Sequence, residues 1–158
     1  MNTITRFLLL IVVAVAVVYL WQSLQRVPAQ QTVSLQETST SYTSEKGVTL
    51  TVTSPILGAT VTSPLTVKGE VPGSWYFEAS FPMVIVNWDG LIIGEGYATA
   101  QAQWMTPEMV PFVGTVNFDA GSSLIEGRQA VVGTLILQRD NPSGLPENDD
   151  AAEIPIRF

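Results

Sequence analysis

The stretch that decides the fold runs from Gly73 to Gly90 and reads Gly-Ser-Trp-Tyr-Phe-Glu-Ala-Ser-Phe-Pro-Met-Val-Ile-Val-Asn-Trp-Asp-Gly. Two tryptophans, two phenylalanines and a tyrosine fall within these eighteen residues, so we expect the hydrophobic core here. Alternation at a period of two predicts a strand over residues 75–81 with one buried face, and a second strand over residues 83–88 after the interruption at Pro82. The dipeptide Asp89-Gly90 then predicts a tight turn.

Short alternating segments on both sides of this stretch predict an all-β domain. Turn signals separate them at intervals of about eight to twelve residues, a spacing typical of an antiparallel β-sandwich. We therefore expect about eight strands in the domain and no long helix. The remaining predicted strands cover residues 48–54, 65–69, 91–98, 112–118, 130–139 and 154–158.

The N-terminal segment, residues 1–24, predicts one transmembrane helix. Residues 7–21 are fifteen uninterrupted apolar or aromatic residues. Counted outward to residues 4–24, a helix spans about 31 Å, which matches the roughly 30 Å of membrane hydrocarbon. All fourteen carboxylates follow residue 36, which favours an amino end inside the cell and a domain outside it. The alternative is a secretory signal cleaved near Ala29.

Residues 25–47 are rich in serine, threonine and glutamine, and they predict a flexible stalk. Segments this polar bury too little apolar surface to offset the entropy lost on ordering. The stalk leaves residues 48–158 as a single domain, which we expect to stand outside the cytoplasm as part of a single-pass membrane protein.

The composition excludes several classes of chemistry. The chain has no histidine and no cysteine, which removes Ser-His and Cys-His nucleophiles, thiolate metal sites and disulfides. Setting aside Arg6 and Arg26 leaves five cationic and fourteen anionic side chains, a net charge of −9 that disfavours nucleic acid. We therefore predict no enzymatic activity, no cofactor and no nucleic-acid partner.

Glu78 lies among the aromatic residues of the first predicted strand of this stretch, and Asp89 and Glu95 follow it on the next predicted hairpin. A glycosidase needs two such carboxylates facing one another. Ordinary alternation along a half-buried strand places Glu78 toward solvent instead, and we favour that interpretation.

Four large aromatic residues suggest a binding surface for a glycan or a peptide, because aromatic side chains stack on sugars and anchor protein interfaces. The alternative is burial in the core, which is common for aromatics in a domain of this size. Together with Glu78, the candidate binding residues are Tyr76, Trp88, Tyr97 and Trp104.

The segment from Asp140 to Asp150 is dense in side-chain oxygens, the ligands that calcium prefers. The calcium candidates are Asp140, Asn141, Asp149 and Asp150. The alternating loop spacing of a calcium-binding EF-hand is missing, however, and Asp-Asn-Pro-Ser-Gly is itself a good turn sequence. We therefore predict a structural loop and no metal.

Taken together, these motifs resemble the immunoglobulin-like domain of bacterial spore germination. The residues that carry the resemblance are Ser54-Pro55, Gly58, Val61, Ser63-Pro64-Leu65, Val67, Gly69, Gly73 to Pro82, Asp89-Gly90, Trp104 to Thr106, Val110 to Phe112 and Arg139 to Gly144. The resemblance implies an immunoglobulin-like sandwich in an envelope or spore-associated protein, with no catalytic residues to carry over.

We therefore expect a membrane-anchored envelope protein that displays one non-catalytic immunoglobulin-like domain and recognises another envelope protein or a cell-wall polymer. The membrane itself is a further expected partner, through residues 4–24. The alternative function is a structural module of a spore-germination or envelope complex.

Overall fold

The structure is a computed structural model that describes residue 2 and residues 13–22, 38–125, 128–129 and 132–158. The chain divides into two compact units, Met1–Gln36 and Glu37–Phe158, which are described separately below. In the first unit, residues 13–22 form a helix. The rest of the predicted anchor and residues 25–37 of the predicted stalk lie outside the described residues. No helix in the part of the chain that the structure describes is both long and apolar enough to cross a membrane.

The second unit is an all-β domain, as predicted, and its main sheet has eight strands joined in an entirely antiparallel ladder. A separate small ladder is formed by β7 (Leu124–Ile125) and β8 (Arg128–Gln129). Short 3₁₀ turns lie at Gly73–Trp75 (η1), Ala120–Ser123 (η2) and Pro146–Asn148 (η3). The strands of the main sheet are β1 (Thr40–Thr43), β2 (Thr49–Ser54), β3 (Leu65–Pro72), β4 (Ser80–Asn87), β5 (Ile92–Ala100), β6 (Met109–Phe118), β9 (Val132–Gln138) and β10 (Ala151–Arg157).

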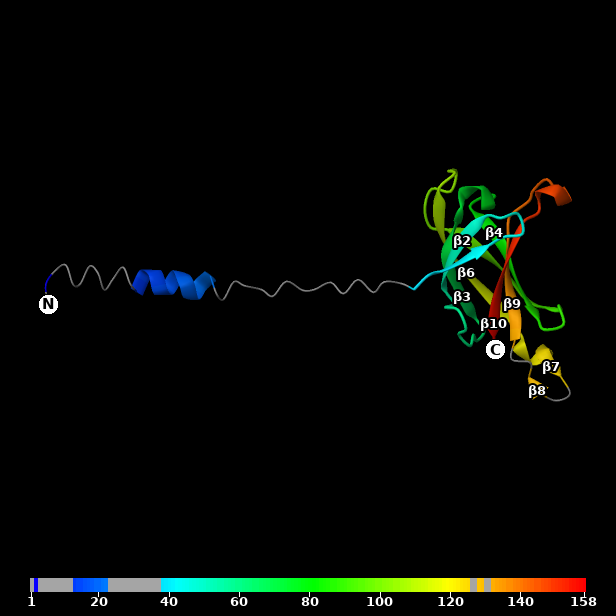
Figure 1. Cartoon of the computed structure of the whole chain (residues 1–158), viewed down its shortest axis with the longest axis horizontal. Helices are drawn as coiled ribbons and strands as arrows, with labels where there is room; N and C mark the ends of the chain where they lie inside the picture. The colour runs from blue at the N-terminus through cyan, green and yellow to red at the C-terminus, as the bar shows by residue number, and fades with distance from the viewer. Residues whose placement is uncertain (1, 3–12, 23–37, 126–127, 130–131) are drawn as a thin grey trace. The chain divides into compact units, whose positions relative to one another are not determined.

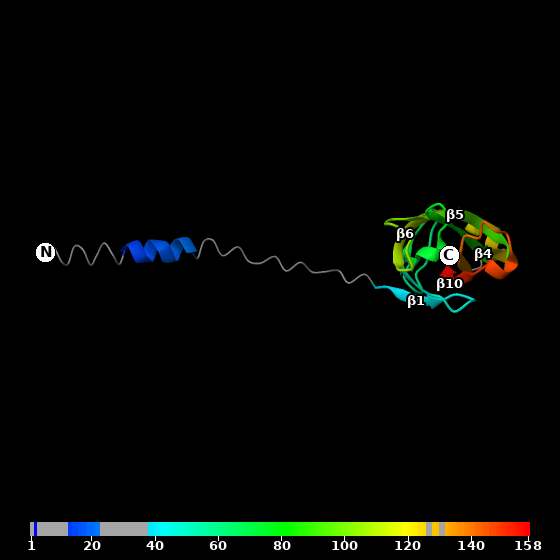
Figure 2. The ribbon, with the colours of Figure 1, turned by 90° about the horizontal axis from the view of Figure 1, so that it is seen from above.

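The sheet curls around its own core. The strand order is β1-β2-β3-β6-β5-β4-β9-β10, and the two edge strands come together again at one end, where the Glu45 N–H donates to the Ala151 carbonyl at 2.9 Å. At the other end of β10, the Val61 N–H donates to the Arg157 carbonyl at 2.8 Å. Figure 2 shows the labelled strands arranged around the core. The predicted sandwich is therefore built from one continuous sheet that is nearly closed.

Aromatic residues from the Gly73–Gly90 stretch form the centre of the core, as predicted. Phe81 is fully buried and packs edge-to-face on Trp75, Tyr76 and Phe112, with ring centroids 6.2, 5.2 and 5.1 Å apart. Such T-shaped pairs favour aromatic contact beyond simple area burial. Leu50 and Val52, from the alternating segment before Pro55, are also fully buried.

The prediction of a strand over residues 75–81 was wrong. Gly73–Trp75 is a 3₁₀ turn, and residues 77–80 form a tight hairpin in which Phe77 and Ser80 exchange two backbone hydrogen bonds of 3.0 Å. Both central residues of this hairpin have positive φ, 49° at Glu78 and 63° at Ala79, the geometry of a type I′ turn. Burial does not alternate along this segment, because Trp75, Tyr76 and Phe81 are buried whereas Phe77 is 43% exposed. Pro82 does not interrupt the chain but lies within β4.

The domain begins before residue 48. Residues 40–43, at the end of the predicted stalk, form β1, which pairs with β2 from Thr40↔Val52 to Thr43↔Thr49. All four residues bear a hydroxyl group and carry little hydrophobic signal, so only pairing with β2 reveals the strand.

The registers define two ends of the domain. The loops after β1, β3, β5 and β9 lie at one end of the domain, which we call the far end. The loops after β2, β4 and β6 lie at the opposite end, which we call the entry end. The chain enters β1 at the entry end and also finishes there, at Phe158. In Figure 1 the C-terminus and the β7–β8 ladder mark this end.

Candidate functional site

Two of the predicted binding aromatics belong to the core. Tyr76 is buried, and its hydroxyl donates to the Val110 carbonyl at 2.9 Å. Trp104 is partly buried and packs against the core from the loop between β5 and β6. For these two residues the structure agrees with the alternative interpretation of core packing.

Trp88 and Tyr97 are exposed but do not form one platform. Trp88 follows β4 at the entry end, whereas Tyr97 lies in the middle of β5, opposite Pro82 and Thr115. Ile92, the first residue of β5, is five residues from Tyr97, a distance of about 16 Å along a strand. The four predicted aromatics are therefore divided between the core and two separate surface positions.

Glu78 is exposed at the turn of the 77–80 hairpin. All of β4 separates it from Asp89, and eight strand residues span about 27 Å. Glu95 lies opposite Val84, four residues into β4 and so about 13 Å from the turn. Glycosidase carboxylates lie about 5 to 10 Å apart, so Glu78 does not form such a pair with Asp89 or with Glu95.

The acidic segment between β9 and β10 is a structural loop held by its own polar side chains. The Asn141 amide donates to the Leu145 carbonyl at 2.8 Å and to the Asp149 carboxylate at 2.7 Å. Gly144 follows with φ of 64°, the left-handed conformation that glycine adopts without strain. Within the described residues, no three acidic side chains gather closely enough to hold a metal ion.

Asp140 and Asp150, the other calcium candidates, have structural contacts of their own. The Asp140 N–H donates to the Trp75 carbonyl at 3.0 Å and so connects this loop to the 3₁₀ turn of the aromatic stretch. Asp150 is only 4% exposed, and its carboxylate accepts hydrogen bonds from the Ser44 hydroxyl at 2.9 Å and the Lys46 N–H at 3.1 Å. Asp150 thus joins the β1–β2 turn to β10 where the sheet closes.

The hairpin between β4 and β5, residues 87–92, holds apolar side chains in solvent. Trp88, Leu91 and Ile92 are 49%, 56% and 54% exposed. The buried Asn87 side chain fixes the turn, because its carbonyl oxygen accepts from the N–H groups of Asp89 at 3.0 Å and Leu91 at 2.9 Å. The sequence predicts this turn and makes Trp88 a candidate binding residue. Asn87 was not among the candidates, although an asparagine two residues before Asp-Gly is itself a turn signal.

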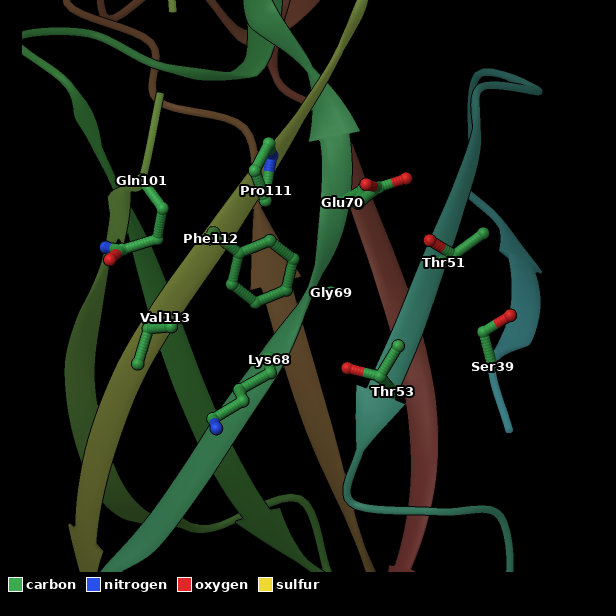
Figure 3. A pocket seen from close by; sticks show the side chains of 10 residues that line it. All are labelled: Ser39, Thr51, Thr53, Lys68, Gly69, Glu70, Gln101, Pro111, Phe112 and Val113. Atoms are coloured by element: carbon green, nitrogen blue, oxygen red, sulfur yellow. The ribbon is translucent and has the colours of Figure 1, made fainter. Parts of the chain in front are cut away.

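A second surface feature is a groove on the outer face of β2, β3 and β6, with a volume of about 380 Å³ (Figure 3). Thr51 and Thr53 of β2 form one side, and Gln101 lies across from them beyond β6. The floor contains Pro111, Phe112 and Val113 of β6 together with Gly69 of β3. Gly69 cannot be replaced without strain, since a Cβ there would lie 2.0 Å from the Thr51 carbonyl oxygen.

Two opposite charges line this groove. Lys68 and Glu70 flank Gly69 on β3 and project to the same outer face. Neither side chain has a hydrogen-bond or ion-pair partner within the described part of the chain. Burial, and then the negative charge of Glu70, raise the pKa of the Tyr76 phenol above its ordinary value of 10.0.

A comparison with family models matched residues 49–132, just over half of the chain, to the immunoglobulin-like domain of bacterial spore germination. The matched segment runs from β2 to the first residue of β9. It includes the aromatic stretch and the 87–92 hairpin, but it ends before the Arg139–Gly144 turn, which the sequence resemblance had also cited. No curated protein and no solved structure matched the chain.

Proposed function

Because the chain belongs to the family of immunoglobulin-like domains of bacterial spore germination, we propose that it is a non-catalytic binding module of the bacterial cell envelope. Its partner is another envelope protein, which it contacts through the 87–92 hairpin. The observation that carries this proposal is the combination of a rigid turn with exposed Trp88, Leu91 and Ile92.

The hairpin has the properties of a preformed protein contact. Tryptophan is enriched among the residues that dominate binding energy, and a pre-ordered contact loses less entropy on binding. Val132 extends the apolar surface: it is 46% exposed and begins β9 next to Gly133, which pairs with Asn87. A single exposed tryptophan is normal on a protein surface. Three exposed apolar side chains on one ordered hairpin are not, and they indicate a contact surface.

Membrane attachment is part of the proposal. It is supported by the uninterrupted apolar run at residues 7–21 and by the absence of carboxylates before residue 37. Extraction of cell membranes with alkaline carbonate tests it: a single-pass protein stays in the pellet with its full mass. A soluble species shortened by cleavage near Ala29 would contradict the anchor.

The absence of catalysis is likewise a proposal. It is supported by a sequence without histidine or cysteine and by the wide separation of Glu78 from both Asp89 and Glu95. Release of soluble fragments from purified cell wall, abolished by Glu78→Gln, would overturn it.

Site-specific photo-crosslinking in the producing cell tests the contact. A photoreactive residue in place of Trp88 should give a discrete protein adduct, and the same residue in place of Glu153, exposed on β10, serves as the matched control. Loss of the adduct in a Leu91→Asp background would locate the contact at the hairpin. Equal labelling from both positions, or adducts to cell-wall material alone, would contradict a protein partner at this site.

The alternative function, a structural module of a germination or envelope complex, shares the same surface. It predicts a stoichiometric adduct that persists at every growth stage, whereas a recognition module gives an adduct that depends on when its partner is present.

A further inference from the structure

The groove of Figure 3 has a chemistry that the hairpin lacks. It lies on the outer face of β3, whose backbone is already paired with β2 on one side and β6 on the other. A ligand there cannot add as another strand and must be recognised by side chains. The side chains available are the hydroxyls of Ser39, Thr51 and Thr53 and the charges of Lys68 and Glu70. The Gln101 amide also lines the groove, and its Nε2 donates to the Thr99 carbonyl at 3.0 Å.

The two charges determine the ligand class. Residues two apart on a strand are separated by about 7 Å, so the groove presents an ammonium and a carboxylate at that spacing. The cations of the far-end loops are engaged, since Lys46 donates to the Glu147 carbonyl and Arg139 donates to the Ser74 carbonyl at 3.1 Å. Lys68 and Glu70 have no such partners in the described residues, and so both are available to a ligand.

A ligand that satisfies both charges carries an anionic and a cationic group. A polyanion is disfavoured by Glu70 and by the net charge of −9 after Arg26, and a neutral sugar leaves both charges unpaired.

We propose that this groove binds a short zwitterionic peptide, of the kind that bacterial cell walls display with free amino and carboxyl groups. The ligand carboxylate pairs with Lys68 and its ammonium with Glu70, while Thr51, Thr53 and Gln101 hydrogen-bond its backbone amides. The inference rests on the proposed function, because it gives the binding module a second ligand. The groove and the 87–92 hairpin have no residue in common.

The first test measures binding of the peptide acetyl-Glu-Ala-Lys-amide to the full chain in detergent micelles, by NMR shifts of the groove residues. Replacing either charged side chain of the peptide with glutamine should weaken binding about threefold to fivefold. The single charge reversals Lys68→Glu and Glu70→Lys should each weaken it about tenfold, but the double reversal should restore it to within about twofold of the wild type, with the peptide turned around.

The double reversal keeps the test valid if one single variant folds poorly, and the methyl signal of the buried Met83 reports folding in every variant. Equal binding of the charged and uncharged peptides, or no recovery in the double reversal, would overturn the proposal. Trp88→Ala should leave peptide binding unchanged. This separates the outcome from the hairpin, so that the failure of one site is distinguishable from the failure of the other.

The second test determines whether the peptides of the cell wall are the ligand. Insoluble cell wall should retain the full chain, and cell wall whose peptides have been removed by an amidase should not. Retention by both preparations, or by neither, would overturn a cell-wall peptide as the ligand.

Discussion

Replacing Asp150 with alanine should weaken the contact between the β1–β2 turn and the start of β10, where the two edges of the curled sheet meet. The Asp150 carboxylate is almost fully buried and accepts two hydrogen bonds, from the Ser44 hydroxyl and the Lys46 N–H, across more than one hundred residues of sequence. Hydrogen bonds to charged groups contribute about 1.5 to 3 kcal/mol each, and burying the carboxylate offsets part of that sum. We expect Asp150→Ala to lower the free energy of unfolding by about 2 to 4 kcal/mol.

The matched control is Asp149→Ala. Asp149 is the exposed neighbour, with one side-chain hydrogen bond to Asn141, and its removal should cost less than about 1 kcal/mol. Asp150→Asn keeps the shape and one acceptor, so it should fall between the two. Urea unfolding of the full chain, followed by tryptophan fluorescence, measures all three through the midpoint at constant slope.

Hydrogen exchange locates the effect. The amides of β1 and of the following turn should exchange faster in Asp150→Ala, while those of β4 and β5 keep their relative protection. If Asp150→Ala and Asp149→Ala have the same stability, or if protection is lost evenly across the sheet, the Asp150 carboxylate does not hold the two edges of the sheet together.

Four further outcomes follow from the structure. Gly73→Ala should destabilise the domain by about 3 kcal/mol in urea, because the new Cβ would lie 2.1 and 2.2 Å from two backbone carbonyl oxygens of the 104–106 loop; a cost below 1 kcal/mol would refute the close approach. Replacing Glu78-Ala79 with Asn-Gly should raise stability by about 1 kcal/mol, since these residues suit positive φ at both central positions; no gain would argue against a type I′ turn. The raised pKa of Tyr76 means that the unfolded chain loses this proton first, so stability should fall as pH rises above about 10, and Tyr76→Phe should reduce that slope in urea titrations; an unchanged slope would contradict a buried phenol. Millimolar calcium should leave the melting temperature unchanged in a calorimeter, because the acidic loop already satisfies its own polar groups; a clear rise would establish a metal site.

The sequence predicted the parts of the fold that depend on local pattern. The strict alternation of residues 48–54 became β2, and the Asp89-Gly90 dipeptide became the turn between β4 and β5. The aromatic stretch was correctly identified as the centre of the core. In each case, burial of alternating or aromatic side chains provides the driving force, and the sequence displays it directly.

The features that were missed depend on contacts between distant segments. Nothing local distinguishes residues 40–43 from a polar stalk, because β1 exists through pairing with β2 and closure near β10. Residues 75–81 alternate like a strand, yet two of them occupy left-handed conformations that the rest of the fold imposes. Lys68 and Glu70 become part of a candidate site only because β3 lies between β2 and the distant β6, which brings Thr51 and Gln101 to the two sides of one groove.

Burial also explains why some of the candidate binding residues lie in the core and others on the surface. Periodicity assigns a residue to a face but does not say whether that face is covered, so Tyr76 and Trp88 looked equivalent in the sequence. The structure covers Tyr76 with the core and leaves Trp88 at a hairpin tip.

Backbone ¹⁵N relaxation of the full chain tests most directly whether residues 87–92 are a preformed contact surface. If the Asn87 side chain holds the turn, the order parameters of this hairpin should equal those of the flanking strands, about 0.85. Values below about 0.6 at Trp88, Asp89 and Leu91 would mean that the exposed apolar residues belong to a disordered loop, and would contradict the proposed mode of binding.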